Sequence, residues 1–261
     1  MTLAERAALL ALYETEMRRD AWVPGLPAHR LSDVTRYHDA ARREVLIMWH
    51  RFAAVDAETI VRRELDHFRG SGGFTWKVYA DDAPENLPDV LMAAGMKLER
   101  GEVNALMVAP AEALARTPEL PPGANIRILK SSADIDLLAA VWDAVWPGGS
   151  GDWVSVLADA LAAHPDQLSI LVVMLDGKPV SSGYIMRDPR GNFAYLGGGG
   201  VLEQHRGKGL YRALVHARAT QARDANIRYL AIEAGPASRP ILERLGFEPL
   251  TTLRFFSRDA P

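Results

Sequence analysis

Six residues after a run of four glycines, the sequence Arg206-Gly-Lys-Gly209 places two cations beside two glycines. The residues from Phe193 to Leu196 are typical of a strand, and the apolar residues from Leu210 onward recur at helical spacing. A glycine-rich turn between a strand and a helix lets several backbone amides point at one spot, at the positive end of the helix dipole. Amides and cations arranged in this way suit a phosphate or a pyrophosphate.

Two familiar phosphate motifs do not fit this turn. A Walker loop would need glycine where Leu202 stands and serine or threonine in place of Gly209. The Rossmann fingerprint would need a third glycine where Arg212 stands. A solvated basic turn that binds nothing remains the structural alternative.

The pattern Val201-x-x-x-x-Arg206-Gly-Lys-Gly209-Leu resembles the acyl-CoA-binding motif of the GNAT superfamily, the GCN5-related N-acetyltransferases. The later run from Ser238 to Phe247 resembles the second signature of that family, a helix followed by Gly-Phe. The resemblance covers roughly residues 123 to 257. It implies an α/β (α+β) fold with a mixed central sheet flanked by helices in the C-terminal half.

The resemblance also assigns residues to acetyl-CoA, which would serve as the co-substrate. The backbone at Val201 and Leu202 would pair with the pantetheine and polarise the thioester carbonyl, and the amides that follow would hold the pyrophosphate. Ser238 matches a polar residue that often contacts CoA, although helix N-capping explains it equally well. The residues assigned to CoA are Val201, Leu202, Arg206, Gly207, Lys208, Gly209, Leu210, Tyr211 and Ser238.

Three positions depart from the family pattern. Tyr211 replaces a small glycine or alanine, and Glu203 replaces a common proline. Leu242 stands where many members carry a tyrosine thought to protonate the leaving thiolate. Two functions therefore stay open: an N-acyltransferase, most simply an acetyltransferase acting on a small primary amine by direct attack in a ternary complex, and a non-catalytic acyl-CoA-binding or regulatory module.

Acyl transfer to an amine also needs groups that move protons. A free alkylamine has a pKa of about 10.4, so it arrives protonated at neutral pH. A carboxylate in the site could accept this proton. Glu203 and Glu233, each at the end of a predicted strand, are the candidate bases, and both are also explained as surface charges. Tyr184 is a candidate acid, with Tyr195 and Tyr211 as alternatives.

Three tryptophans flank the break Pro147-Gly-Gly-Ser-Gly151, in the region where GNAT helices cover the acceptor. Together with Asp143 and Asp152 they would suit a cationic or aromatic amine, and helix packing explains them nearly as well. The predicted substrate pocket comprises Trp142, Trp146 and Trp153.

Composition limits the remaining classes of function. The net charge of −3 over 261 residues does not suggest binding to nucleic acid. The longest uncharged apolar run, residues 168 to 175, is too short to span a bilayer, and the charged N-terminus is unlike a signal peptide. Seven histidines without close pairing and no cysteine predict no metal site. We expect a cytoplasmic protein with no membrane partner, either monomeric or homodimeric.

An internal repeat predicts two domains, a degenerate GNAT-like domain at residues 1–118 and a GNAT acetyltransferase domain at 119–261. A shift of 151 residues places Gly95 on Gly246 and Met96 on Phe247. In place of the basic glycine turn, residues 55–58 read Val-Asp-Ala-Glu, so the first domain should bind no CoA. A proline-containing linker, residues 110–122, joins the two.

Periodicity and turn signals place the main elements. The first half should hold helices at 2–19, 56–68 and 85–94 and strands at 44–52, 74–80 and 103–108, with an irregular segment at 22–30. The second half should hold strands at 125–129, 168–175, 180–187, 228–234 and 251–257, and a glycine-rich strand that opens at Phe193 and continues into residues 197–200. Its helices should run from about 131 to 146, to about 163, from 207 to 225 and from about 238.

Overall fold

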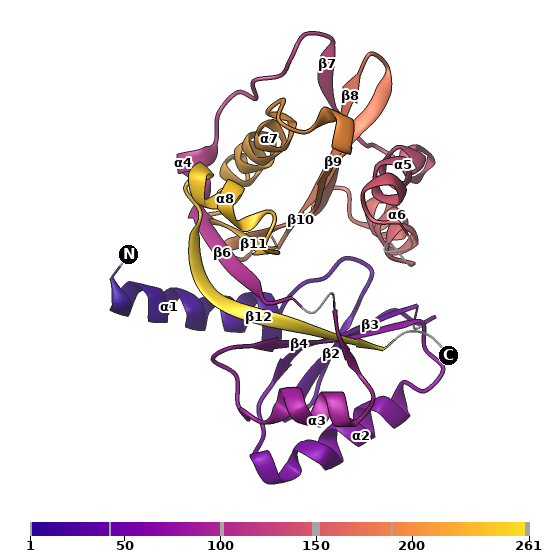
Figure 1. The fold of residues 1–261 in the computed structure, drawn as a ribbon, viewed down its shortest axis with the longest axis vertical. Helices are drawn as coiled ribbons and strands as arrows, with labels where there is room; N and C mark the ends of the chain where they lie inside the picture. The colour runs from indigo at the N-terminus through magenta and orange to yellow at the C-terminus, as the bar shows by residue number, and fades with distance from the viewer. Residues whose placement is uncertain (1, 42, 100–101, 148–151, 189, 259–261) are drawn as a thin grey trace. The chain divides into compact units, whose positions relative to one another are not determined.

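The computed structural model describes residues 2–41, 43–99, 102–147, 152–188 and 190–258, and the chain forms two compact units (Figure 1). The first unit comprises Met1–Met107, Glu233–Ile241 and Pro249–Pro261, and the second comprises Val108–Ile232 and Leu242–Glu248. The last strand of the chain therefore belongs with the N-terminal half. The division into domains at residues 118 and 119 stays a prediction, and residues 148–151 of the predicted break lie outside the described residues.

The first unit contains a mixed sheet in the order β1-β2-β3-β4-β12. Its one parallel pair, β3 with β4, needs a crossover connection, which α2 supplies. Figure 1 shows α2 and α3 side by side on this unit. The strands are β1 (Ala28–Arg30), β2 (Val34–His38), β3 (Glu44–His50), β4 (Gly73–Tyr79), β5 (Lys97–Leu98) and β12 (Glu248–Arg258); the helices are α1 (Leu3–Tyr13), a π-helix (Glu14–Arg19), α2 (Ala57–His67) and α3 (Leu87–Ala93).

In the second unit, β7, β8, β9, β10 and β11 are neighbours in that order, and their pairs are antiparallel except the last. Here α7 supplies the crossover between the parallel strands β10 and β11. The strands are β6 (Asn104–Pro110), which crosses from the first unit, β7 (Ala124–Ile128), β8 (Leu168–Leu175), β9 (Lys178–Arg187), β10 (Phe193–Val201) and β11 (Tyr229–Ala234); the helices are α4 (Ala111–Leu114), α5 (Asp136–Val145), α6 (Trp153–Ala163), α7 (Leu210–Asp224) and α8 (Arg239–Leu245).

The predicted fold class, α/β with a mixed sheet flanked by helices, is confirmed. Three local predictions were incomplete. The irregular segment at 22–30 ends in β1, which pairs with the unpredicted β2. The predicted linker begins with α4, and the helix predicted from residue 207 begins at Leu210. In the part of the chain that the structure describes, every helix is too short or too polar to cross a membrane.

Each unit has its own apolar core. In the first, the buried residues Ile60 and Val61 of α2 pack with Leu87 and Leu91 of α3 and with Trp76 of β4. In the second, α5 and α6 pack against β8 and β9. The regularly spaced apolar residues of these helices thus face the sheet of their own unit.

The repeat predicted from the sequence has a structural counterpart at two helix ends. After α3, the amide of Gly95 donates to Met92 O and the amide of Met96 donates to Leu91 O. After α8, Gly246 donates to Glu243 O and Phe247 to Leu242 O, the same bonds shifted by 151 residues. Gly95 and Gly246 both have a positive φ, +89° and +99°, as this type of helix end requires. The two segments therefore end in the same way.

Buried charges in the first unit are paired. Arg18 and Asp82 form a salt bridge of 2.8 Å, and the Arg18 guanidinium lies 3.9 Å from the centre of the Tyr79 ring. Glu233 accepts bonds from the Lys77 ammonium at 2.7 Å and from the Tyr79 hydroxyl at 2.7 Å. Burial raises the pKa of Tyr79 well above its ordinary value, and the charge of Glu233 adds to that rise. These side chains connect the π-helix to β4 and its following turn, and β4 to the end of β11.

His50, beside this cluster, is a fully buried imidazole. Its Nδ1 accepts a bond from Trp76 Nε1 at 3.2 Å, and its Nε2 lies 3.6 Å from Asp82 Oδ2. Burial lowers the pKa of His50 from 6.5 to about 4, the Asp82 carboxylate opposes that shift, and Arg18 adds to it. The imidazole is therefore neutral in the folded protein at neutral pH.

We expect this histidine to make the free energy of unfolding fall as the pH falls from 6.5 to 4. Above that range both states hold His50 neutral, whereas within it only the unfolded chain binds the proton, so the loss approaches about 1.4 kcal/mol per pH unit. Urea unfolding at several pH values should show this slope in the wild type and its reduction in His50→Gln. His164→Gln, which changes an exposed histidine, serves as the control. Equal slopes in wild type and His50→Gln would contradict the assignment.

Candidate functional site

The glycine run of β10 contains a bulge. Gly197 pairs with Tyr184 and Gly200 pairs with Ser182, so two residues of β10 face one residue of β9. Gly198, inside the bulge, has a φ of +59°, which favours glycine. The bulge re-aims the backbone just before the turn into α7.

The turn after β10 exposes the two predicted cations. Gly207 and Gly209 have φ values of +76° and +77°, and a Cβ at Gly207 would meet no atom within 4 Å. Arg206 and Lys208 are exposed, with Arg206 Nε 3.4 Å from Val201 O and Lys208 Nζ 3.4 Å from His205 Nδ1. Gly209 caps α7, whose first-turn amides have no acceptors within the helix. The turn therefore presents amides and cations together to solvent, as an anion site requires.

The backbone at the other predicted CoA contacts is partly engaged. The amide of Leu202 donates to Val180 O at 3.0 Å, and the Val201 carbonyl lies near the Arg206 guanidinium. Leu210 is buried and Tyr211 is half-buried. The Ser238 hydroxyl donates to Gly235 O at 3.2 Å, in the turn before α8. Ser238 belongs to the first unit, whereas the turn at Arg206 belongs to the second.

Aromatic side chains fill the space that the four glycines leave. A Cβ atom at Gly197 would lie 2.1 Å from Tyr184 Cζ, and one at Gly198 would lie 2.3 Å from Trp142 Cζ2. On the α7 face, a Cβ at Gly199 would lie 2.8 Å from Tyr211 Cε2, whereas on the α5 face one at Gly200 would lie 3.0 Å from Trp146 Cη2. The glycines thus admit rings from both helices and from β9.

The structure brings together two of the three predicted pocket tryptophans. Trp142 and Trp146 pack edge to face, with ring centres 5.8 Å apart, and the Trp142 centre lies 6.2 Å from that of Tyr184. Trp153, on α6, packs against the same apolar core. Tyr195 is half-buried against that core as well.

Arg218 is a buried charge that the sequence analysis missed. Its guanidinium is fully buried beneath the bulge and donates to Tyr184 O at 3.2 Å and to Gly197 O at 3.4 Å, while Nη2 has no hydrogen-bond partner among the described residues. A Cβ at Gly183 would lie 2.8 Å from Arg218 Nη1, so Gly183 provides its room. Burial lowers the pKa of Arg218, and burial raises the pKa of Tyr211, which the Arg218 charge opposes. The sequence held one signal for this burial: Arg218 follows Leu214 by four residues, which places it on the buried face of α7.

The two candidate bases have different surroundings. Glu203 is exposed in the short helical turn that follows β10. The Glu233 side chain is only 3% exposed, and both of its oxygens are bonded, to Lys77 and Tyr79. Leu242, at the position of the absent tyrosine, is fully buried. The role of base stays a prediction for both carboxylates.

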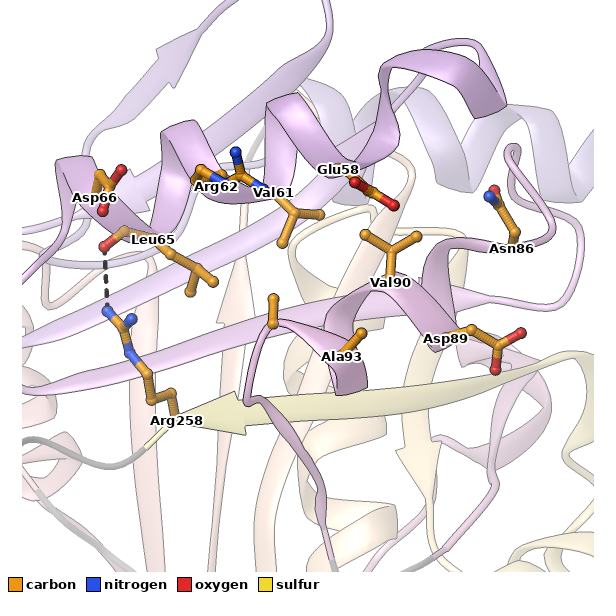
Figure 2. A pocket seen from close by; sticks show the side chains of 11 residues that line it. Glu58, Val61, Arg62, Leu65, Asp66, Asn86, Asp89, Val90, Ala93 and Arg258 are labelled. Atoms are coloured by element: carbon orange, nitrogen blue, oxygen red, sulfur yellow. Dashed lines mark hydrogen bonds between the residues drawn. The ribbon is translucent and has the colours of Figure 1, made fainter.

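The first unit has a pocket of about 620 Å³ between α2 and α3, shown in Figure 2. Val61, Leu65 and Val90 are among its apolar side chains, and Arg258 reaches Leu65 O at 3.3 Å. Glu58, 151 residues before Gly209, lines the pocket at the start of α2. The carboxylates that line this pocket are Glu58, Asp66 and Asp89.

Residues 138–247 match the family model described as the acetyltransferase (GNAT) family. Among solved structures, the chain is similar to a GCN5-related N-acetyltransferase from Kribbella flavida, with a TM-score of 0.64, 17% identity and coverage of 100% of this chain and 97% of that one. It is also similar to a functionally unknown conserved protein from Staphylococcus epidermidis, with a TM-score of 0.66, 16% identity and coverage of 93% and 97%. A third similar structure is a tandem GNAT protein from the clavulanic acid biosynthesis pathway, with a TM-score of 0.58, 15% identity and coverage of 93% of this chain and 86% of that one. No curated protein matches the sequence.

The match to this family model covers residues 138–247, the part of the chain that contains both sequence motifs. The matched segment begins within α5 and includes the glycine run, the basic turn and α7. The solved structures, at 17% identity and below, establish the fold that the whole chain shares with them.

The ring packing at the bulge predicts that alanine substitution destabilises the protein by different amounts at two glycines of similar φ, Gly198 and Gly207. Gly198→Ala should lower the free energy of unfolding by about 3 kcal/mol, because the left-handed backbone costs about 1–2 kcal/mol and overpacking against Trp142 costs about 1–3 kcal/mol. Gly207→Ala has the same backbone but open space, so it should lose only about 1–2 kcal/mol. Urea unfolding of both variants makes the comparison. A loss in Gly207→Ala as large as that in Gly198→Ala would contradict the tight packing.

Proposed function

We propose that this chain is an acyl-CoA-dependent N-acyltransferase that moves an acetyl group from acetyl-CoA to a primary amine of a small molecule. The basic turn carries the proposal, because exposed Arg206 and Lys208 stand beside left-handed glycines and the open amides of α7. This turn lies inside the segment that matches an acetyltransferase family. A pyrophosphate fits these donors, and open space at Gly207 permits its close approach.

Acetyl-CoA, when bound, supplies an activated thioester. The amine nitrogen attacks the thioester carbonyl carbon, the C–N bond forms and the C–S bond breaks, and the sulfur departs as a thiolate that takes up a proton. Glu203 is the proposed acceptor of the amine proton, since its exposed carboxylate follows the bulge directly. Glu233 is a second candidate, although proton uptake there would break its ion pair with Lys77.

Two tyrosines replace the absent acid in this proposal. Tyr184 and Tyr211 contact the glycine run from opposite sides, so each brings a phenol near the bulge. The Arg218 charge opposes the burial-induced rise in the pKa of Tyr211, and this helps the phenol to release its proton. Tyr211 and Tyr184 are therefore both proposed as donors of the proton that the thiolate takes up.

A non-catalytic acyl-CoA-binding module is the second candidate. Leu242 is fully buried at the position where many GNAT enzymes carry their acid, and this observation favours the second candidate. The basic turn fits either function. The first half, in both cases, is proposed to be a GNAT-like copy that binds no CoA.

An acyltransferase should release CoA from acetyl-CoA when a suitable amine is present. A thiol-reactive dye measures that release without background from the protein, because the chain contains no cysteine. A broad panel of primary amines should include acceptors that raise the rate above hydrolysis, and Tyr211→Phe should lower that rate. Measurable acetyl-CoA binding without release for any amine would instead support the binding module.

Reversing the two cations of the turn should abolish most acetyl-CoA binding with little effect on folding. Each charge-assisted bond to phosphate is worth about 1.5–3 kcal/mol, whereas exposed substitutions change stability by about 0.5 kcal/mol. Calorimetry should find one acetyl-CoA per wild-type chain and strongly weakened binding in Arg206→Glu with Lys208→Glu. Lys130→Glu with Lys178→Glu makes the same charge change at exposed positions elsewhere in the second unit.

A single site is expected because the first half lacks the required turn. Residues 55–58 contain no glycine, and Glu58 places a carboxylate on the pocket beside α2. Unchanged affinity in the Arg206 and Lys208 double variant would remove this turn from the binding site. Two acetyl-CoA molecules per chain would show that the first half also binds the co-substrate.

A further inference from the structure

The glycine run of β10 leaves room that the protein fills from α5. Trp142 lies over Gly198 and Trp146 over Gly200, close enough that no side chain could stand at either glycine without displacing an indole. Glycines in a strand commonly mark a place where another group approaches the backbone. At these two positions, the approaching groups are the protein's own rings.

Trp142 is fixed in place and supports the ring of Trp146. It is only 4% exposed, its Nε1 donates to Gly198 O at 3.3 Å, and it contacts both Tyr184 and Trp146. Trp146 is half-buried and also packs beside Val145 at Gly200. Trp146 is therefore the more accessible member of a supported pair, and it lies over Gly200, the residue before Val201.

We propose that Trp146, backed by Trp142, closes the end of the acyl-binding space and limits the acyl group to acetyl. This inference rests on the proposed function, in which the backbone near Val201 holds the thioester carbonyl. A carbon chain that extends from that carbonyl along β10 toward Gly200 meets the Trp146 indole. Acetyl ends before this ring, whereas butyryl and hexanoyl chains would have to displace it.

The tightness of the pair explains why a longer chain cannot push it aside. Movement of Trp146 toward the sheet is stopped at Gly200, where its Cη2 lies 3.0 Å from the position of a Cβ. Movement along α5 is stopped by Trp142, which is itself buried and bonded to the strand. Truncating Trp146 removes the exposed ring and leaves the support of Trp142 in place.

Calorimetric titration with acetyl-, butyryl- and hexanoyl-CoA tests this assignment without requiring turnover. The wild type should bind acetyl-CoA most tightly. In Trp146→Ala, affinity for butyryl-CoA relative to acetyl-CoA should rise by up to about fifteenfold, since each of the two newly buried methylenes is worth about fourfold in affinity. Trp146→Leu should give a smaller rise in the same direction and guards against loss of folding in the alanine variant.

Leu137→Ala is the matched control, because Leu137 is a half-buried residue of the same helix that packs on the same core, and the atoms nearest to a Cβ at each of the four glycines belong to other residues. It should leave the ratio of the affinities unchanged. If the ratio of butyryl-CoA to acetyl-CoA affinity is unchanged in both Trp146 variants while acetyl-CoA binding is retained, the role of Trp146 in limiting the acyl group is overturned and the proposed function is not. A wild type that prefers hexanoyl-CoA would overturn this role as well. A wild type that binds none of the three would remove the proposed function itself.

Discussion

The absence of side chains at Gly197 to Gly200 is the constraint on which the second unit depends. Four rings from β9, α5 and α7 occupy the space that those side chains would take, and the distances leave no place for a Cβ at Gly197 or Gly198. The same absence permits the left-handed backbone at Gly198 and with it the bulge. Packing of both helices and the shape of the strand before the basic turn therefore follow from one short sequence feature.

Burial of Arg218 belongs to the same arrangement. A buried guanidinium is costly, and among the residues that the structure describes its partners here are backbone carbonyls, those of Leu214, Tyr184 and Gly197, rather than a carboxylate. The buried charges of the first unit are treated differently, since Arg18 has Asp82 and Lys77 has Glu233. Arg218 thus places an unneutralised positive charge under the strand where the proposed reaction generates a thiolate.

Local patterns in the sequence were sufficient for the basic turn and for most helices and strands. The turn is encoded within a few residues, and its glycines adopt a left-handed backbone. Contacts between distant residues were not predictable in this way. Glu233 pairs with Lys77 across 156 residues, and nothing near either residue indicates the other. The ring of Tyr211 was likewise assigned only by position, because its contact at Gly199 depends on how α7 lies on β10.

A comparison of the two halves of the chain distinguishes features that the fold requires from features that a bound ligand would require. The helix ends at Gly95 and Gly246 share the same two hydrogen bonds and are followed by buried Met96 and Phe247, since each must end a helix and begin a strand. The turns before α2 and α7 share neither glycines nor charge. A helix can begin at Asp56 without any ligand, so the fold places no demand on that turn. Selection by a bound pyrophosphate would act only on the turn at Arg206, and it is there that the cations, the left-handed glycines and the open amides occur together.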